Sequence, residues 1–152
     1  MAELNNITRT SAAILAGRKT DPTNQNRTRV AVIETAAAYT AANGDTFATG
    51  IVLPKGTRLL MPVSLSNAAN AASVTLSLGL RDATTKVAID ATAIMAATAI
   101  ASAQAIQVNT GTKLTAGQFY VLPQDCEIYG TFGGATPNAN VAIRAEVSYV
   151  AP

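Results

Sequence analysis

Strict alternation of apolar and polar side chains marks the stretch Ser73-Val74-Thr75-Leu76-Ser77-Leu78-Gly79-Leu80-Arg81. Because successive side chains of a β-strand point to opposite faces, the four aliphatic residues of this stretch share one face. The other face carries Ser, Thr, Gly and Arg. The pattern therefore predicts a strand with one buried and one exposed face, as is typical of antiparallel sheets.

Similar short segments follow one another along most of the chain. Besides residues 73–81, we expect strands over residues 29–34, 46–53, 57–66, 86–91, 105–108, 118–122, 127–132 and 141–149. Turn signals separate them: Asn43-Gly44 is expected to form a type I′ turn, and Pro54-Lys55-Gly56 a second turn. About nine strands at this spacing, without helices long enough for parallel crossovers, predict an all-β, antiparallel β-sandwich of jelly-roll type.

Two segments depart from the simple pattern. Pro62 removes a backbone donor from the strand at 57–66, so we expect this strand to lie at a sheet edge or to contain a bulge. Residues 90–103 are rich in alanine, and Asp90 is a suitable N-cap, although the threonines and Ile100 favour a strand. We expect a short helix or an irregular crossing segment there.

The first 29 residues differ in composition from the rest. Residues 1–29 contain five basic and two acidic side chains and few large apolar ones, and Pro22 disfavours helix at the preceding residue. Such a segment cannot bury enough apolar surface to stay ordered alone, so its order is expected to come from a partner. We therefore divide the chain into an extended N-terminal arm, 1–29, and a sandwich domain, 30–152.

The residue inventory argues against an enzyme. The chain has no histidine, which excludes histidine-based triads and zinc hydrolase sites. The lone cysteine, Cys126, lies between Asp125 and Glu127, whose negative charge is expected to raise its pKa. Carboxylate pairs, Asp82 with Asp90 or Asp125 with Glu127, are non-specific candidates for acid–base catalysis or calcium binding. We expect no enzymatic activity, no metal and no cofactor.

The surface composition favours contact with other proteins. Charged residues make up only 13% of the chain, and Ala, Thr, Ser and Asn are abundant, which suggests a surface that is covered by other protein. The bases are scattered without interleaved aromatics, so direct nucleic-acid binding is not expected. No apolar run is long enough to span a membrane. Tyr120 and Tyr129 are candidates for a sugar-binding platform, although packing within the sheets is the commoner fate of such residues.

Three segments resemble a pattern found in small proteins of tailed bacteriophages. They are Ala42-Asn-Gly-Asp-Thr-Phe-Ala-Thr-Gly-Ile-Val-Leu-Pro-Lys-Gly-Thr-Arg-Leu-Leu, Ser73-Val-Thr-Leu-Ser-Leu-Gly-Leu-Arg-Asp and the late Gly-Gly-Ala-Thr-Pro-Asn-Ala-Asn-Val-Ala-Ile. Between about Tyr39 and Tyr149 the chain is similar to capsid cement, or decoration, proteins. The resemblance implies a jelly-roll sandwich that binds the outer surface of the phage capsid.

The same resemblance implies a structural virion protein that stabilises the capsid by bridging neighbouring major capsid subunits. Its partners would be the major capsid protein and copies of itself, as a dimer or a trimer. The arm matches no motif of the family, so its role follows from its composition alone. We expect the arm to contact the capsid through two apolar anchors and five bases: Ile14, Leu15, Arg9, Arg18, Lys19, Arg27 and Arg29. The alternative is a carbohydrate-binding or receptor-binding β-sandwich module of a phage particle.

Overall fold

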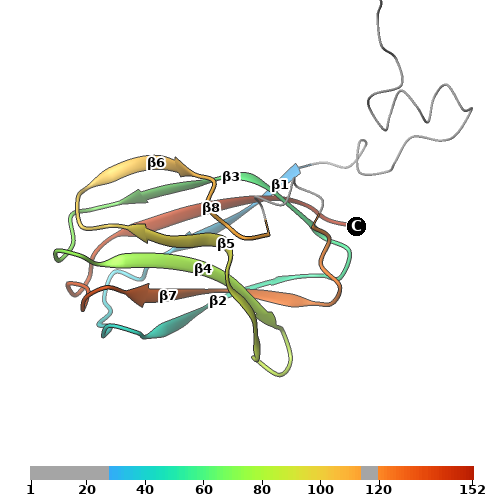
Figure 1. Cartoon of the computed structure of the whole chain (residues 1–152), viewed down its shortest axis with the longest axis horizontal. Helices are drawn as coiled ribbons and strands as arrows, with labels where there is room; N and C mark the ends of the chain where they lie inside the picture. The colour runs from blue at the N-terminus through green and yellow to red at the C-terminus, as the bar shows by residue number, and fades with distance from the viewer. Residues whose placement is uncertain (1–27, 114–119) are drawn as a thin grey trace, which may run out of the picture.

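The computed structural model of the chain describes residues 28–113 and 120–152, which form eight β-strands (Figure 1). The strands are β1 (Thr28–Glu34), β2 (Thr46–Leu53), β3 (Arg58–Asn67), β4 (Thr75–Asp82), β5 (Ala88–Ala99), β6 (Gln104–Val108), β7 (Cys126–Gly133) and β8 (Ile143–Val150). Seven of the nine expected strands correspond closely to one of these, including the alternating stretch that became β4. No helix in the described part of the chain is long and apolar enough to cross a membrane.

The strands form two four-stranded antiparallel sheets. One sheet has the order β1-β8-β3-β6 and the other the order β2-β7-β4-β5. Strands that are consecutive in the sequence alternate between the sheets at every step from β1 to β4, and the first strand pairs with the last. This connectivity is that of a jelly roll, as the sequence predicted.

The core lies between the two sheets and is almost wholly aliphatic. In β4 the side chains of Leu76, Leu78 and Leu80 are buried, and Val74 just before the strand is also buried. They pack against inward residues of the opposite sheet such as Val147. The strict alternation of residues 73–81 thus correctly predicted which face of β4 is buried.

The expectation of a helix or irregular segment over residues 90–103 is wrong, because Ala88–Ala99 form strand β5. Backbone pairing on both edges overrides the helix preference of alanine. One edge of β5 pairs with β4, and on the other edge Lys113 N donates to Ala93 O at 3.0 Å. Register shifts against β4 let three consecutive residues, Ala93, Ile94 and Met95, all be buried.

Gly79 permits the close approach of β4 and β5. A Cβ atom at this position would lie 2.6 Å from Asp90 O and 2.7 Å from Ala91 Cα, both of them backbone atoms. We expect Gly79→Ala to push β5 away and to lower the free energy of unfolding by about 1–3 kcal/mol. Ser77→Ala, on the same outward face, is the matched control and should change it by less than about 0.5 kcal/mol. Urea denaturation of both variants measures the difference, and equal stabilities would contradict the close approach.

Pro62 lies in an interior strand rather than at an edge. Strand β3 pairs with both β8 and β6, and its register against β8 shifts between Leu59 and Val63. The bulge alternative is therefore correct and the edge alternative is wrong. The shift moves Pro62 out of the regular ladder, where its missing donor would otherwise leave an acceptor of β8 unpaired.

The turn at residues 42–45 also differs from the expectation. Asp45 N donates to Ala42 O at 3.2 Å, and only Gly44 has a positive φ, of 89°. A type I′ turn needs positive φ at both central residues, so the pattern fits a type II turn. The turn lies between β1 and β2, which belong to different sheets. It therefore does not close a two-stranded hairpin, the setting in which type I′ turns are favoured.

Two expectations lie partly or wholly outside the described residues. Of the strand expected over residues 118–122, only the last three residues are described, and Val121 there forms a single bridge with Arg58. Thr28 and Arg29, which we assigned to the arm, lie in strand β1. Residues 1–27, the rest of the expected arm, are outside the described part of the chain.

Candidate assembly surface

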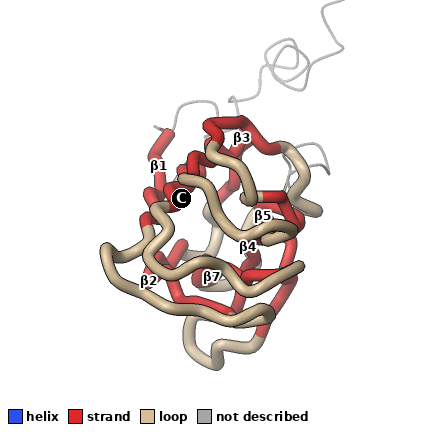
Figure 2. The backbone as a smooth tube through the Cα atoms, turned by 90° about the vertical axis from the view of Figure 1, so that its left-hand side faces the viewer, coloured by secondary structure: helices blue, strands red, loops and turns tan. Residues whose placement is uncertain are grey.

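One end of the sandwich is formed by four loops whose only charged residue is Asp45, the last residue before β2. They join β1 to β2, β3 to β4, β5 to β6 and β7 to β8, and comprise residues 35–45, 68–74, 100–103 and 134–142. Because each loop joins the same ends of antiparallel strands, all four meet at one end, which lies on the left in Figure 1 and faces the viewer in Figure 2. We call these four loops, without Asp45 at their border, the uncharged end. Their exposed side chains are mainly those of Ala, Asn, Thr, Ser and Gly.

Asparagine side chains tie the loops of the uncharged end to one another. Asn140 Oδ1 accepts a hydrogen bond from Tyr39 N at 2.8 Å, and Asn140 N donates back to Tyr39 O at 3.1 Å. Asn70 Oδ1 accepts from Asn138 N at 2.8 Å, and Asn70 N donates to Ala101 O. All four loops are thereby linked in a single network, so the shape of this end is preorganised.

Asn67 anchors the network at the end of β3. Its side chain is buried, and its Nδ2 donates to Ile100 O at 3.0 Å and to Ser102 O at 2.9 Å. Asn140 itself has a φ of 63°, a left-handed conformation that asparagine tolerates better than most residues. Asparagine thus serves these loops in two ways, through its amide hydrogen bonds and through its backbone conformation.

The opposite end carries the described chain termini and much of the charge. Thr28, the first residue of β1, pairs with Val150, the last residue of β8, and Val150 also pairs with Arg58. The loops at this end contribute Lys55, Lys86 and Asp125, among other charged residues. Thr28, the first described residue, therefore lies at the charged end, far from the uncharged loops (Figure 1).

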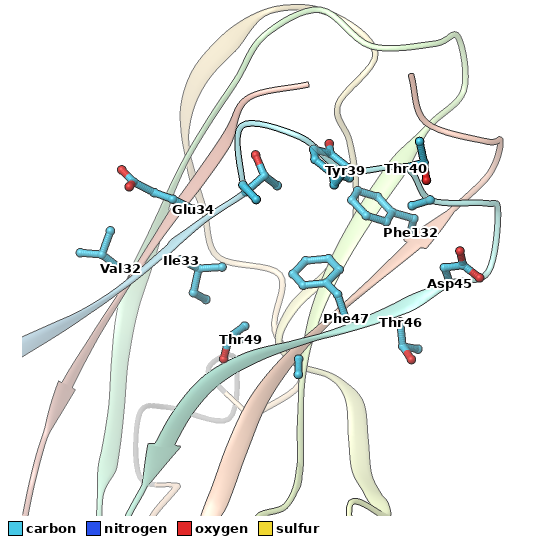
Figure 3. Close-up of a pocket in the computed structure, with 14 residues that line it drawn as sticks. Val32, Ile33, Glu34, Tyr39, Thr40, Asp45, Thr46, Phe47, Thr49 and Phe132 are labelled. Atoms are coloured by element: carbon cyan, nitrogen blue, oxygen red, sulfur yellow. The ribbon is translucent and has the colours of Figure 1, made fainter. Parts of the chain in front are cut away.

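A groove of about 590 Å³, lined by both polar and apolar residues, opens between the edge strands β1 and β2. Ile33 points into it from β1 and Phe47 from β2, as Figure 3 shows. The rings of Tyr39 and Phe132 stack beside them, with their centroids 6.3 Å apart. The lining residues include two acids and no base. Since Tyr39 belongs to the loop between β1 and β2, the groove is continuous with the uncharged end.

The carboxylates considered as catalytic pairs have structural roles instead. Glu127 lies on the outer face of β7 but is buried, and its Oε2 accepts from Arg81 Nε at 2.9 Å and Lys86 Nζ at 2.8 Å. These two hydrogen bonds lower the pKa of Glu127 from 4.5 to about 2. Its expected partner Asp125 instead accepts from Lys55 N at 2.7 Å through Oδ1. The two side chains are therefore engaged with different groups.

The other expected pair is equally unsuited to acid catalysis. Asp82 Oδ1 accepts from Thr85 N and Thr84 N, and these hydrogen bonds lower its pKa. Burial tends to raise the pKa of Asp90, but hydrogen bonds from Thr112 and Thr92 outweigh it, so the pKa falls. Both groups are ionised at neutral pH and cannot donate a proton there. Among the residues that the structure describes, no group of three or more His, Cys, Asp and Glu is arranged to hold a metal.

Cys126 is a buried residue with a raised pKa, as expected. The main cause is burial, followed by the negative charges of Asp82 and Asp125. Glu127, the sequence neighbour that suggested part of the effect, does not contribute, because it faces the opposite side of β7.

The two tyrosines considered for a sugar platform do not form one. Tyr129 is buried on the outer face of β7, and the guanidinium of Arg81 lies 5.5 Å from its ring centroid. Tyr120 is half-buried, with Lys113 Nζ 5.0 Å from its ring centroid. Every aromatic side chain in the described ranges is at least partly buried. A flat, exposed aromatic surface of the kind that stacks on sugar rings is thus missing from residues 28–113 and 120–152.

Of the residues predicted to contact a capsid, the structure describes only Arg29. It is exposed in β1 and lies opposite Tyr149 of β8. Arg9, Ile14, Leu15, Arg18, Lys19 and Arg27 lie outside the described residues, so the predicted arm contacts remain a prediction. The sequence analysis did not predict the uncharged end. Each of its four stretches lacks charged residues in the sequence, but they share no motif and become neighbours only in the fold.

The sequence matches no protein-family model and no curated protein. Comparison of the structure with solved structures does find similar folds. A chain of the cyanophage Pam1 capsid asymmetric unit matches with a TM-score of 0.59 and 19% sequence identity, over 84% of this chain and 86% of that one. A chain of the capsid of Ralstonia phage GP4 matches with a TM-score of 0.63 and 16% identity, over 83% and 85%. These likenesses establish a shared jelly-roll fold over most of the chain.

Proposed function

We propose that this protein is a non-enzymatic structural component of a phage virion that binds the outer surface of the capsid and bridges neighbouring major capsid subunits. The observation that carries the proposal is the likeness to chains of two phage capsids, which extends over more than four fifths of both chains in each comparison. Fold alone does not determine function, so the character of the surface provides the second support.

That surface is poor in the groups that most enzymes use. The described carboxylates are engaged in ion pairs and turns, and the sequence contains no histidine. A low charge content suits a surface that contacts protein over large areas, because burying few charges reduces the cost of desolvation. The carbohydrate-binding alternative has less support, since the described aromatic side chains are at least partly buried.

The position of the arm suits a bridging role. Residues 1–27 precede Thr28 at the charged end of the sandwich, and 27 residues can span at most about 90–97 Å when extended. An arm of this length can reach a subunit beside the one beneath the sandwich. Ile14 and Leu15 then serve as apolar anchors, and the arm bases pair with acids of the major capsid protein. Each arm adds a weak contact whose effect is multiplied by tethering.

Heads assembled from the major capsid protein encoded with this chain provide the test. We expect the purified full-length protein to co-sediment with such heads at a saturable stoichiometry and to raise the temperature at which they rupture. Heads of an unrelated phage are the control for non-specific adsorption. Failure to bind the cognate heads, or equal binding to both kinds, would contradict the proposal.

A further inference from the structure

Strand β1 presents an unprotected edge beside the groove. It lies at the end of its sheet and pairs with β8 along its whole length without a register shift. Thr35 N donates to Ile143 O, which fixes the odd-numbered residues of β1 as those that hydrogen-bond to β8. The backbone groups of Val30, Val32 and Glu34 therefore point to the free edge. Proline, lysine, a bulge or a covering segment usually protects such an edge, and the described residues provide none of these at β1.

The edge of β5 shows how the same fold covers a free edge. Thr112 N donates to Thr92 O and Lys113 N to Ala93 O, both at 3.0 Å, so the segment after β6 lies along β5. Within the described ranges no segment lies along β1 in this way, and the groove opens there instead. A strand added to β1 closes this side of the sandwich and directs alternate side chains between the sheets, toward Phe47 (Figure 3).

The lining of the groove selects the chemistry of such a strand. Ile33 and Phe47 offer apolar contact, whereas Glu34 and Asp45 are the charged residues of the lining. The side chain of Glu34 remains 57% exposed although it pairs with Arg144. Because the lining contains two acids and no base, it favours an extended segment in which aliphatic side chains lie close to bases.

The arm of the same chain has this composition and is tethered beside the groove. Its adjacent aliphatic residues and the nearest bases are Ile14, Leu15, Arg9, Arg18 and Lys19. The arm leads directly into Thr28, the first residue of β1, so a segment that turns back runs antiparallel to this strand. Asp21 and Pro22 are residues that favour such a turn. Tethering gives the arm an effective concentration of about millimolar at the groove, which favours it over a separate partner or a second copy.

We propose that in the free protein the N-terminal arm docks on the edge of β1 as an additional strand, with Leu15 in the groove. If residues 21–27 form the connection, residues 14–20 lie opposite residues 28–34. Leu15 is then directly opposite Ile33 and points to the same face of the sheet. The docked arm pairs the free backbone groups of β1 and covers the apolar wall of the groove.

The inference goes beyond the proposed function, because it concerns the protein without a capsid. Binding to heads requires the arm to leave the groove, so we expect docking to be weak, about tenfold in favour of the docked arm. Removal of the arm should accordingly change the unfolding temperature little. Tests on the free protein leave the capsid proposal standing if docking fails.

A spin label on the arm of the full-length chain measures docking. Ala16→Cys carries a nitroxide next to the anchor residues, and Cys126 is buried and stays unlabelled. We expect the nitroxide to broaden the NMR signals of the Ile33 and Phe47 amides strongly. The amide of Thr84, in the exposed loop between β4 and β5 at the charged end, should be affected much less.

Val32→Pro tests the added strand itself. Because Val32 N points to the free edge, proline removes a donor there without breaking a hydrogen bond to β8, and edge strands tolerate this change. Val32→Thr is the matched control, since it keeps both the N–H group and a β-branched side chain. Broadening at Ile33 and Phe47 should fall at least about threefold in Val32→Pro and stay near the wild-type level in Val32→Thr.

The charge of the groove is tested separately. Glu34→Gln with Asp45→Asn keeps hydrogen-bond acceptors at both positions but removes both charges, so broadening should decrease and lose its dependence on salt. Glu146→Gln is the control, because Glu146 also pairs with Arg144 but does not line the groove. It should leave the broadening unchanged.

A mixed sample identifies whose arm occupies the groove. Isotope-labelled chains without a nitroxide are combined with spin-labelled chains that carry no isotope, and we expect no broadening at Ile33 or Phe47. Broadening as strong as in the single-species sample would assign the groove to the arm of a second copy. That result, the lack of broadening in the full-length chain, or equal broadening in Val32→Pro and Val32→Thr would overturn the inference.

Discussion

Replacing Glu127 by alanine should lower the free energy of unfolding by about 3 kcal/mol. The loss leaves Arg81, whose side chain is only 16% exposed, without its counter-charge on the outer face of β4. Removing one partner of a buried ion pair costs about 3–5 kcal/mol, because the other charge stays desolvated and unpaired. We take the lower end of that range, since the side chain of Lys86 is 51% exposed and can turn to water.

The same carboxylate should make stability depend on pH. Its pKa is about 2 in the folded protein, against 4.5 for the free group. A carboxyl group with a lowered pKa contributes stability that is fully present above about pH 4.5 and is lost as the pH falls through about 2. We expect roughly 2–3 kcal/mol to disappear over this window, because each unit of pKa shift corresponds to about 1.4 kcal/mol and the exposed Lys86 is screened by solvent.

Glu127→Gln isolates the charge from the packing. Its stability should fall below that of the wild type by a constant amount above pH 4.5, and the difference should shrink toward zero near pH 2. Glu146→Gln is the matched control, because Glu146 pairs with the exposed Arg144 at 2.7 Å and such pairs contribute less than about 1 kcal/mol. Chemical denaturation at a series of pH values gives the comparison. Parallel pH profiles for Glu127→Gln and the wild type would show that the ion pair does not stabilise the sandwich.

The sequence predicted strands best where apolar and polar residues alternate regularly and one face of the strand is buried. Residues 73–81 form a strand with one buried face because each inward position holds a residue that must leave water. Residues 90–99 were predicted wrongly because alanine has little side chain to reveal a period, and its helix preference is smaller than the gain from pairing with β4. Pro62 allowed two explanations that only the strand order could separate.

The candidate surface was harder to predict than the fold. The network of Asn67, Asn70 and Asn140 depends on loops that are 30 to 100 residues apart in the sequence. Each asparagine alone looks like an ordinary turn residue. The burial of Glu127 was similarly hidden, because its partner Arg81 lies on β4, the neighbouring strand of the sheet, and Lys86 in the loop after β4, both more than 40 residues earlier in the chain. Long-range pairing of this kind follows from topology, which local patterns do not encode.

Deleting residues 1–27 should abolish most capsid binding while leaving the sandwich folded. Strand β1 begins at Thr28, so the truncated chain keeps its complete register with β8 and all eight strands. We therefore expect an unchanged far-ultraviolet circular dichroism spectrum and a similar unfolding temperature. If the arm tethers each copy to a second capsid subunit, its loss removes the gain from effective concentration, and the affinity for heads should fall by about 10²-fold or more.

Substitutions within the arm then divide its contribution between apolar and ionic contacts. Ile14→Ser with Leu15→Ser keeps the length and charge of the arm, whereas glutamine at Arg9, Arg18, Lys19 and Arg27 keeps its apolar anchors. Only the charge variant should flatten the dependence of binding on salt, because screening acts on ion pairs and not on apolar burial. Arg29→Gln is the control within the folded domain, since Arg29 belongs to β1 and faces solvent; we expect its effect to be smaller than that of the four arm bases together. Truncated protein that binds cognate heads as tightly as the full chain would move the binding site from the arm to the sandwich.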